Sequence, residues 1–215
     1  GLSDLAGGEV PMTRASISQA GLVEGVDVRM VIAGEGDPTT VRSFNQGRIQ
    51  AYAGAKRDLL LLPAQDIPTR SITPPEIAAF PGDALAVRAE TLEEDRDLLV
   101  RFVRATLKGV AWGMANTDET FELLRTKYAA ASLGDNPVAL EFWELVQTYY
   151  TPPKGLEPHG VFVPEAWDVY MGYLQMGEAE QKALAGPVDL EEILIDDIVL
   201  EAWDGLDMES VIAQR

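Results

Sequence analysis

The sequence contains no cysteine and only one histidine among its 215 residues. Disulfide bonds, thiolate metal sites and cysteine nucleophiles are therefore excluded. His159 lies between a proline and a glycine and has no Ser or Asp partner at a spacing that a catalytic triad would use. We interpret it as a structural residue and expect no catalytic residue in the chain.

Basic residues are scarce, with 17 Lys and Arg against 35 Asp and Glu and a formal charge of -18 at pH 7. This charge argues against nucleic acid and anionic membrane surfaces as partners. No apolar run approaches the roughly 20 residues that cross a bilayer. The first ten residues also lack the basic and apolar regions of a signal peptide, so we expect any export signal to have been removed already.

Residues 45–62 have the order of a helix end, a short strand and a loop. Residues 39–45 suit a helix that Gly47 ends, because glycine takes the left-handed cap conformation without steric cost. Residues 48–53 alternate between apolar and polar side chains, which predicts a strand with Tyr52 on its polar side.

The loop after this predicted strand begins with two residues that have almost no side chain, Gly54 and Ala55. A compact ligand could approach the backbone there, and Lys56, Arg57 and Asp58 would place polar groups within its reach. The segment therefore suits a binding loop, although its pattern is not specific to one ligand.

Residues 26–33 also alternate and predict a strand, and the sequence GEGDP at residues 34–38 predicts the turn into the next helix. Asp37 would cap this helix and Pro38 would be its first residue. A glycine-rich turn before a helix can bind phosphate, but the Lys-Ser/Thr pair of a phosphate loop is missing. We interpret the segment as an ordinary turn.

The second half of the chain is predicted to be mainly helical. Residues 91–114 form the clearest helix, with a capping box of Thr91 and Glu94 and apolar residues at helical spacing. Further helices are predicted from Asn116, from Pro137, from Pro164 and from Asp189. The four tryptophans, Trp112, Trp143, Trp167 and Trp203, all fall within these helices and are interpreted as core residues.

Several phrases of the sequence resemble one family. LSDLAGG at residues 2–8 is similar to the phrase that opens the second lobe of periplasmic solute-binding proteins of ABC importers, in the nitrate, sulfonate, taurine and thiamine-pyrimidine-precursor group. FPGDALAVR at residues 80–88 resembles the strand that returns to their first lobe. The helix before ANTDE at residues 115–119, and PVDLEEIL at residues 187–194, also resemble phrases of this family.

The resemblance implies an α/β fold of the type II periplasmic-binding-protein kind, with two lobes joined by a hinge. Residues 1–79 would form lobe 2, shortened near its start, and residues 80–215 the C-terminal part of lobe 1 with a helical tail. We expect the N-terminal half of lobe 1 to be absent from this sequence, or to be supplied by a second chain.

The implied function is the extracytoplasmic capture of a small organic solute in a cleft between the lobes, followed by delivery to an ABC permease at the membrane. The protein would be periplasmic or extracellular, and association with a lipid or membrane is left open. We expect Tyr52, Gly54, Lys56, Arg57 and Asp83 to contact the solute, with Asp83 at the mouth of the cleft.

The solute itself is left open. The acidic composition favours a neutral or cationic ligand such as a pyrimidine, whereas a sulfonate or nitrate would depend on Lys56 and Arg57. No cofactor or metal is expected, because the acidic residues at 191, 192, 196 and 197 would lie around an exposed helix rather than in an oxygen cage.

The alternative function is an enzyme, because fungal pyrimidine synthases that use pyridoxal phosphate resemble the same fold. Their reactive cysteine cluster has no counterpart in a chain without cysteine. We therefore expect a binding protein rather than an enzyme.

Overall fold

The computed structural model describes residues 1–77, 80–151, 158–175 and 186–213. The chain divides into two compact units. Unit 1 comprises Gly1–Phe80 and Glu165–Val188, and unit 2 comprises Pro81–Pro164 and Asp189–Arg215. The assignment of residues 1–79 and 80–215 to two family lobes stays a prediction.

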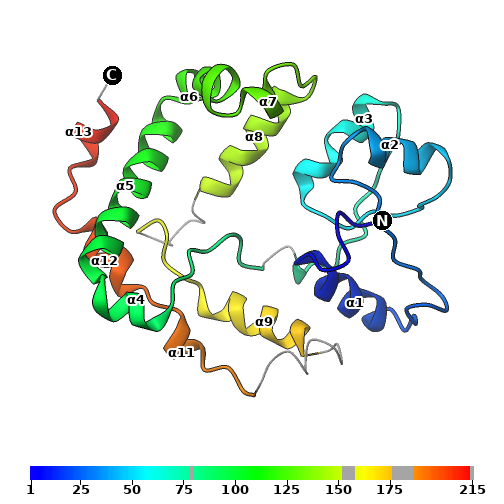
Figure 1. Cartoon of the computed structure of the whole chain (residues 1–215), viewed down its shortest axis with the longest axis horizontal. Helices are drawn as coiled ribbons and strands as arrows, with labels where there is room; N and C mark the ends of the chain where they lie inside the picture. Colours follow the sequence, from blue (N-terminus) through cyan, green and yellow to red (C-terminus); the bar gives the residue numbers. More distant parts are fainter. Residues whose placement is uncertain (78–79, 152–157, 176–185, 214–215) are drawn as a thin grey trace. The chain divides into compact units, whose positions relative to one another are not determined.

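Unit 1 consists of short helices joined by extended segments and turns (Figure 1). Asp37 caps the second helix by accepting hydrogen bonds from the backbone N–H groups of Thr39 and Thr40, as predicted. Gly47, with φ of 66°, follows this helix in the left-handed conformation. The helical elements are α1 (Glu9–Gln19), α2 (Pro38–Asn45), the 3-10 helix η1 (Lys56–Leu59), α3 (Leu61–Ala64) and α9 (Pro164–Leu174), which starts at the unit boundary.

Unit 2 is organised around one long helix, α5 (Arg96–Ala115). The predicted helix of residues 91–114 is interrupted at Asp95, which leaves the helical conformation with φ of -122° and ψ of 27°. The other helical elements are α4 (Ala89–Glu94), α6 (Thr117–Leu123), the π-helix η3 (Leu124–Tyr128), α7 (Ala130–Leu133), α8 (Ala139–Tyr150), α11 (Leu190–Ile193), α12 (Asp197–Trp203) and α13 (Met208–Ile212). Helices α12 and α13 pack along α5 (Figure 1).

The prediction of an α/β fold with two lobes is wrong. Within the described residues, β pairing is limited to two isolated parallel bridges, Leu2 with Ile32 and Glu24 with Val28, and no sheet forms. The three segments predicted as strands, 26–33, 48–53 and 80–88, are non-helical but do not pair with one another. An alternating pattern specifies an extended backbone with two faces, but a sheet also needs neighbouring strands to satisfy its N–H and C=O groups.

The core of unit 2 lies between α5 and α12. Val100 and Leu107 of α5 pack against Ile198 and Ala202 of α12, and Ala202 is fully buried. Arg104 of α5 reaches the end of α12 and donates hydrogen bonds to the carbonyl oxygens of residues 201, 202 and 204. Apolar burial and carbonyl capping therefore join the same two helices.

Unit 1 buries Leu2, Leu62 and Thr40 almost completely. A separate aromatic cluster joins Phe80 to Tyr170 and Tyr173 of α9, with edge-to-face ring centroids 5.3 and 5.0 Å apart. The buried Tyr173 hydroxyl donates a hydrogen bond to the Gln19 side chain at 3.2 Å, which ties α9 to the end of α1.

Candidate functional site

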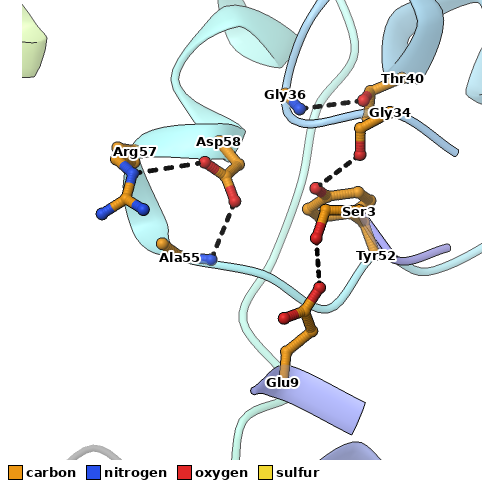
Figure 2. Close-up of polar contacts among 9 residues, drawn as sticks. All are labelled: Ser3, Glu9, Gly34, Gly36, Thr40, Tyr52, Ala55, Arg57 and Asp58. Atoms are coloured by element: carbon orange, nitrogen blue, oxygen red, sulfur yellow. Dashed lines mark hydrogen bonds and ion pairs between the residues drawn. The ribbon is translucent and has the colours of Figure 1, made fainter. Parts of the chain in front are cut away.

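The predicted ligand residue Tyr52 lies within a group of polar contacts in unit 1. Its side chain is half-buried, and its hydroxyl donates a hydrogen bond of 2.9 Å to the carbonyl oxygen of Gly34 (Figure 2). Segment 48–53 thus brings the phenol to the glycine-rich turn at residues 34–37. We call the residues labelled in Figure 2 the Tyr52 network: Ser3, Glu9, Gly34, Gly36, Thr40, Tyr52, Ala55, Arg57 and Asp58.

The glycine-rich turn is held by its own polar groups and by the start of α2. Gly34 and Gly36 both have positive φ, 92° and 75°, which other residues rarely adopt. The N–H of Gly36 donates to the hydroxyl oxygen of Thr40 at 3.0 Å, and Thr40 is completely buried. The carboxylate of Asp37 accepts from the N–H groups of Thr39 and Thr40 at 3.0 and 3.2 Å.

These contacts bear on the phosphate-binding alternative for residues 34–38. The N–H groups at the start of a helix are the usual donors to a bound phosphate. Here two of them donate to the Asp37 carboxylate, which places a negative charge where an anion would bind. The structure therefore agrees with the interpretation as an ordinary turn.

A second turn, formed by residues 54–58, faces the glycine-rich turn. The carboxylate of Asp58 accepts from the N–H of Ala55 at 3.0 Å, and the N–H of Asp58 donates to the Ala55 carbonyl at the same distance (Figure 2). Glycine suits position 54, because a Cβ atom there would come within 2.5 Å of the Tyr52 ring and 2.8 Å of the Asp58 carboxylate. The Arg57 Nε atom lies 3.7 Å from the other oxygen of that carboxylate.

The electrostatics of the network are dominated by carboxylates. Burial, followed by the charges of Asp58, Glu9, Glu35 and Asp37, raises the pKa of Tyr52 to about 12. Burial also raises the pKa of Asp58, although Arg57 and the Ala55 N–H oppose this shift. The Tyr52 phenol therefore stays neutral at physiological pH in a negative local field.

Glu9, the first residue of α1, is the carboxylate that the surrounding donors stabilise. Burial by itself would raise its pKa, but hydrogen bonds from the Ser3 hydroxyl and from backbone N–H groups outweigh burial and lower it. The Ser3 hydroxyl donates directly to Glu9 (Figure 2). Within the Tyr52 network, Glu9 is therefore a charged residue rather than a candidate proton donor.

The structure places four of the five predicted ligand residues on one short segment of unit 1. Tyr52 and Gly54 border the turn of residues 54–58, and Lys56 and Arg57 are exposed on η1. Asp83 belongs to unit 2, where its side chain is exposed, and its role in a site stays a prediction.

Sequence reasoning missed Gly36 and Thr40 as parts of the candidate site. The glycine-rich turn was interpreted by its local role before α2, and pattern analysis cannot show that it meets a turn some twenty residues later. The spacing of glycine and threonine in GEGDPTT was a usable signal, because a Thr side chain in the first turn of a helix can accept from a preceding backbone N–H.

The residues that sequence analysis set aside have structural contacts in unit 2. Asp196 accepts a hydrogen bond from the Phe162 N–H, and Asp197 pairs with Arg96 at 3.1 Å. Within the described ranges, no group of three or more His, Asp or Glu residues could hold a metal ion. Burial lowers the pKa of His159, and its carbonyl accepts a hydrogen bond from the Trp203 indole at 2.8 Å.

A family model described as NMT1/THI5 like matches residues 1–120, which is more than half of the chain. The chain therefore belongs to the NMT1/THI5-like family, and this confirms the family expected from its phrases. The family consists of solute-binding and related proteins, and the matched residues include the whole Tyr52 network. No curated protein and no solved structure matches the chain. In the part of the chain that the structure describes, no helix has both the length and the apolarity needed to span a membrane.

Proposed function

We propose that this protein is the extracytoplasmic solute-binding component of an ABC importer, which captures a small organic solute and delivers it to a membrane permease. The observation that carries this proposal is the family match over residues 1–120, which includes the Tyr52 network. A binding protein of this kind needs a preorganised polar surface and no covalent chemistry. The hydrogen-bonded turns at residues 34–37 and 54–58 supply such a surface.

Within unit 1 the solute is proposed to contact the ring of Tyr52, the backbone at Gly54, and the side chains of Lys56 and Arg57. Tyr52 supplies an aromatic surface that is half-buried and fixed at its hydroxyl end. Gly54 is exposed, and Lys56 and Arg57 can reach a bound molecule because both are also exposed. The predicted cleft between two α/β lobes forms no part of this proposal.

The charges around Tyr52 favour a neutral or cationic solute over an anion. Four carboxylates act on the Tyr52 hydroxyl, whereas Arg57 already lies near one of them, Asp58. An anionic solute would have to overcome this negative field with Lys56 and Arg57 alone. An aminopyrimidine is therefore a better first probe than nitrate or taurine.

The test is isothermal titration of the full 215-residue chain with 4-aminopyrimidine, taurine and nitrate as separate probes. We expect 4-aminopyrimidine to bind, and Tyr52→Ala to weaken this binding at least tenfold. Tyr128→Ala is the matched control, since Tyr128 belongs to unit 2 and its side chain is 69% exposed. Absence of binding for all three probes, or an equal loss in both variants, would contradict the proposal.

The competing function within the same family is a pyrimidine-synthase-like enzyme. It would require a lysine that forms a Schiff base with pyridoxal phosphate, and Lys56 and Lys108 are both exposed. Absorbance spectra after incubation with pyridoxal phosphate test this directly. A Schiff-base band that disappears in Lys56→Ala or in Lys108→Ala would favour the enzyme, and an unchanged cofactor spectrum would favour the binding protein.

A further inference from the structure

Gly36 and Asp58 are in direct backbone contact, although 21 positions separate them in the sequence. A Cβ atom on Gly36 would overlap the carbonyl oxygen, the Cα atom and the carbonyl carbon of Asp58. These are backbone atoms, which cannot rotate away as the end of a flexible side chain can. The glycine-rich turn and the turn of residues 54–58 therefore meet at a point where no side chain fits.

Gly36 is also held in place by a hydrogen bond to the start of α2. Its N–H donates to the buried hydroxyl of Thr40, and the preceding Gly34 accepts from Tyr52. The turn of residues 54–58 is closed by two hydrogen bonds between Ala55 and Asp58. A displacement of Gly36 would therefore be passed to Asp58 and to the hydrogen bonds that close its turn.

We infer that Gly36 is a positioning residue for solute binding, which holds the turn of residues 54–58 in its binding conformation without touching the solute. The inference rests on the proposed function, because that turn carries the proposed contacts at Gly54, Lys56 and Arg57. A turn that is already ordered before binding costs less conformational entropy on binding than one that must be ordered by the solute. Loss of the contact should therefore weaken solute affinity.

The test compares Gly36→Ala with Gly47→Ala in the full chain. Both glycines have positive φ, 75° and 66°, so alanine strains the backbone at either position. Only Gly36 is packed against another segment, since a Cβ atom on Gly47 would meet no atom within 4 Å. The pair therefore separates the contact with Asp58 from the strain of a left-handed alanine.

The first measurement needs no solute: hydrogen exchange at the N–H groups of Ala55 and Asp58. We expect Gly36→Ala to accelerate exchange at both groups about tenfold or more relative to Gly47→Ala, with exchange in α1 unchanged. The second measurement is the affinity for 4-aminopyrimidine, which should weaken about tenfold in Gly36→Ala and about twofold or less in Gly47→Ala. A general loss of stability in Gly36→Ala would instead accelerate exchange in α1 as well.

Thr40→Val keeps the inference testable if Gly36→Ala does not fold. It removes the acceptor for the Gly36 N–H and nearly preserves shape, and Thr40→Ser retains the hydroxyl as the rescuing variant. Equal exchange in the Gly36 and Gly47 variants would overturn the inference, as would faster exchange with unchanged affinity. If wild-type protein binds no probe, the proposed function fails on its own, and the exchange data alone decide whether Gly36 holds the turn.

Discussion

The hydroxyl of Tyr52 donates a 2.9 Å hydrogen bond to the carbonyl oxygen of Gly34, and this bond fastens an extended segment to the glycine-rich turn. Through Gly36 that turn also packs against Asp58, so three stretches of unit 1 meet at this point. Disturbing this bond should therefore affect more than one residue.

Tyr52→Phe removes the hydroxyl and keeps the ring. We expect a loss of about 1 kcal/mol in the free energy of unfolding, the usual value for one hydrogen bond. Urea denaturation followed by circular dichroism measures this loss. A variant as stable as the wild type would show that water replaces Tyr52 at the Gly34 carbonyl without cost.

The raised pKa of Tyr52 should make stability depend on pH in the alkaline range. In the folded chain the pKa of Tyr52 is raised to about 12, above its ordinary value of 10. Between these two values the unfolded chain loses this proton and the folded chain keeps it, so the contribution of Tyr52 to stability is present below pH 10 and is lost as the pH rises toward 12. The absorbance of tyrosinate should show a late component near pH 12 that is missing in Tyr52→Phe. Identical titration curves for the two proteins would contradict this prediction.

The raised pKa of Asp58 should make stability depend on pH in the acidic range. Burial raises its pKa above the ordinary value of 3.8. The folded chain therefore holds this proton more tightly than the unfolded chain, and the stability that Asp58 contributes is present below that value and falls as the pH rises through the raised pKa. Asp58→Asn removes the titration and can still accept from the Ala55 N–H.

The stability of Asp58→Asn relative to wild type should consequently increase from acidic to neutral pH. Denaturation curves collected at several pH values for both proteins measure this change. Asp58→Ala is the control for the lost acceptor, and we expect it to be less stable than Asp58→Asn by about 1 kcal/mol. A difference between wild type and Asp58→Asn that does not vary with pH would refute the prediction.

Replacing Arg104 should lower the stability of unit 2. Its planar guanidinium donates to three carbonyl groups at the end of α12, at distances of 2.8 to 3.1 Å. Lysine keeps the charge but lacks the planar set of N–H donors. Arg104→Lys should therefore lower the free energy of unfolding by about 1 kcal/mol or more. Arg101→Lys is the matched control, because Arg101 lies on the same helix in an exposed pair with Asp97 and should cost about 0.5 kcal/mol or less. Chemical denaturation should rank the two variants in this order.

Helix α5 also offers a matched pair of leucines. Leu107 is 5% exposed and packs against α12, whereas Leu98 is 52% exposed. Leu107→Ala should lower the free energy of unfolding by about 3 kcal/mol, through lost burial and an unfilled cavity. Leu98→Ala should change it by about 0.5 kcal/mol or less. Equal losses in denaturant unfolding would mean that α12 does not cover α5 in solution.

The local elements show how far sequence reasoning reaches in this protein. Asp37 and Pro38 start α2, Gly47 follows it in the left-handed conformation, and the four tryptophans lie in helices, all as predicted. Each of these depends on interactions within a few residues, so the local sequence is sufficient to predict it. The interruption at Asp95 was not predicted, because the apolar spacing of residues 91–114 continues through it.

The strand predictions failed for the opposite reason. Residues 26–33 and 48–53 have alternating patterns, and the family resemblance predicts a strand over residues 80–88. Strand pairing depends on distant partners, and within the described residues the bridges of Leu2 with Ile32 and Glu24 with Val28 are isolated. Leu85 and Val87, which lie in the third of these segments, remain exposed because no sheet forms among the described residues to cover them.

By itself, the sequence determined the family, the absence of cysteine chemistry, the acidic character and the cap of α2, because these follow from residue identity and short-range spacing. Only the tertiary structure decided that Tyr52 bonds to Gly34, that Gly36 meets Asp58, and that α12 covers α5. Each of these contacts joins residues separated by many positions in the chain. Such contacts depend on the packing of whole segments, which local pattern does not specify.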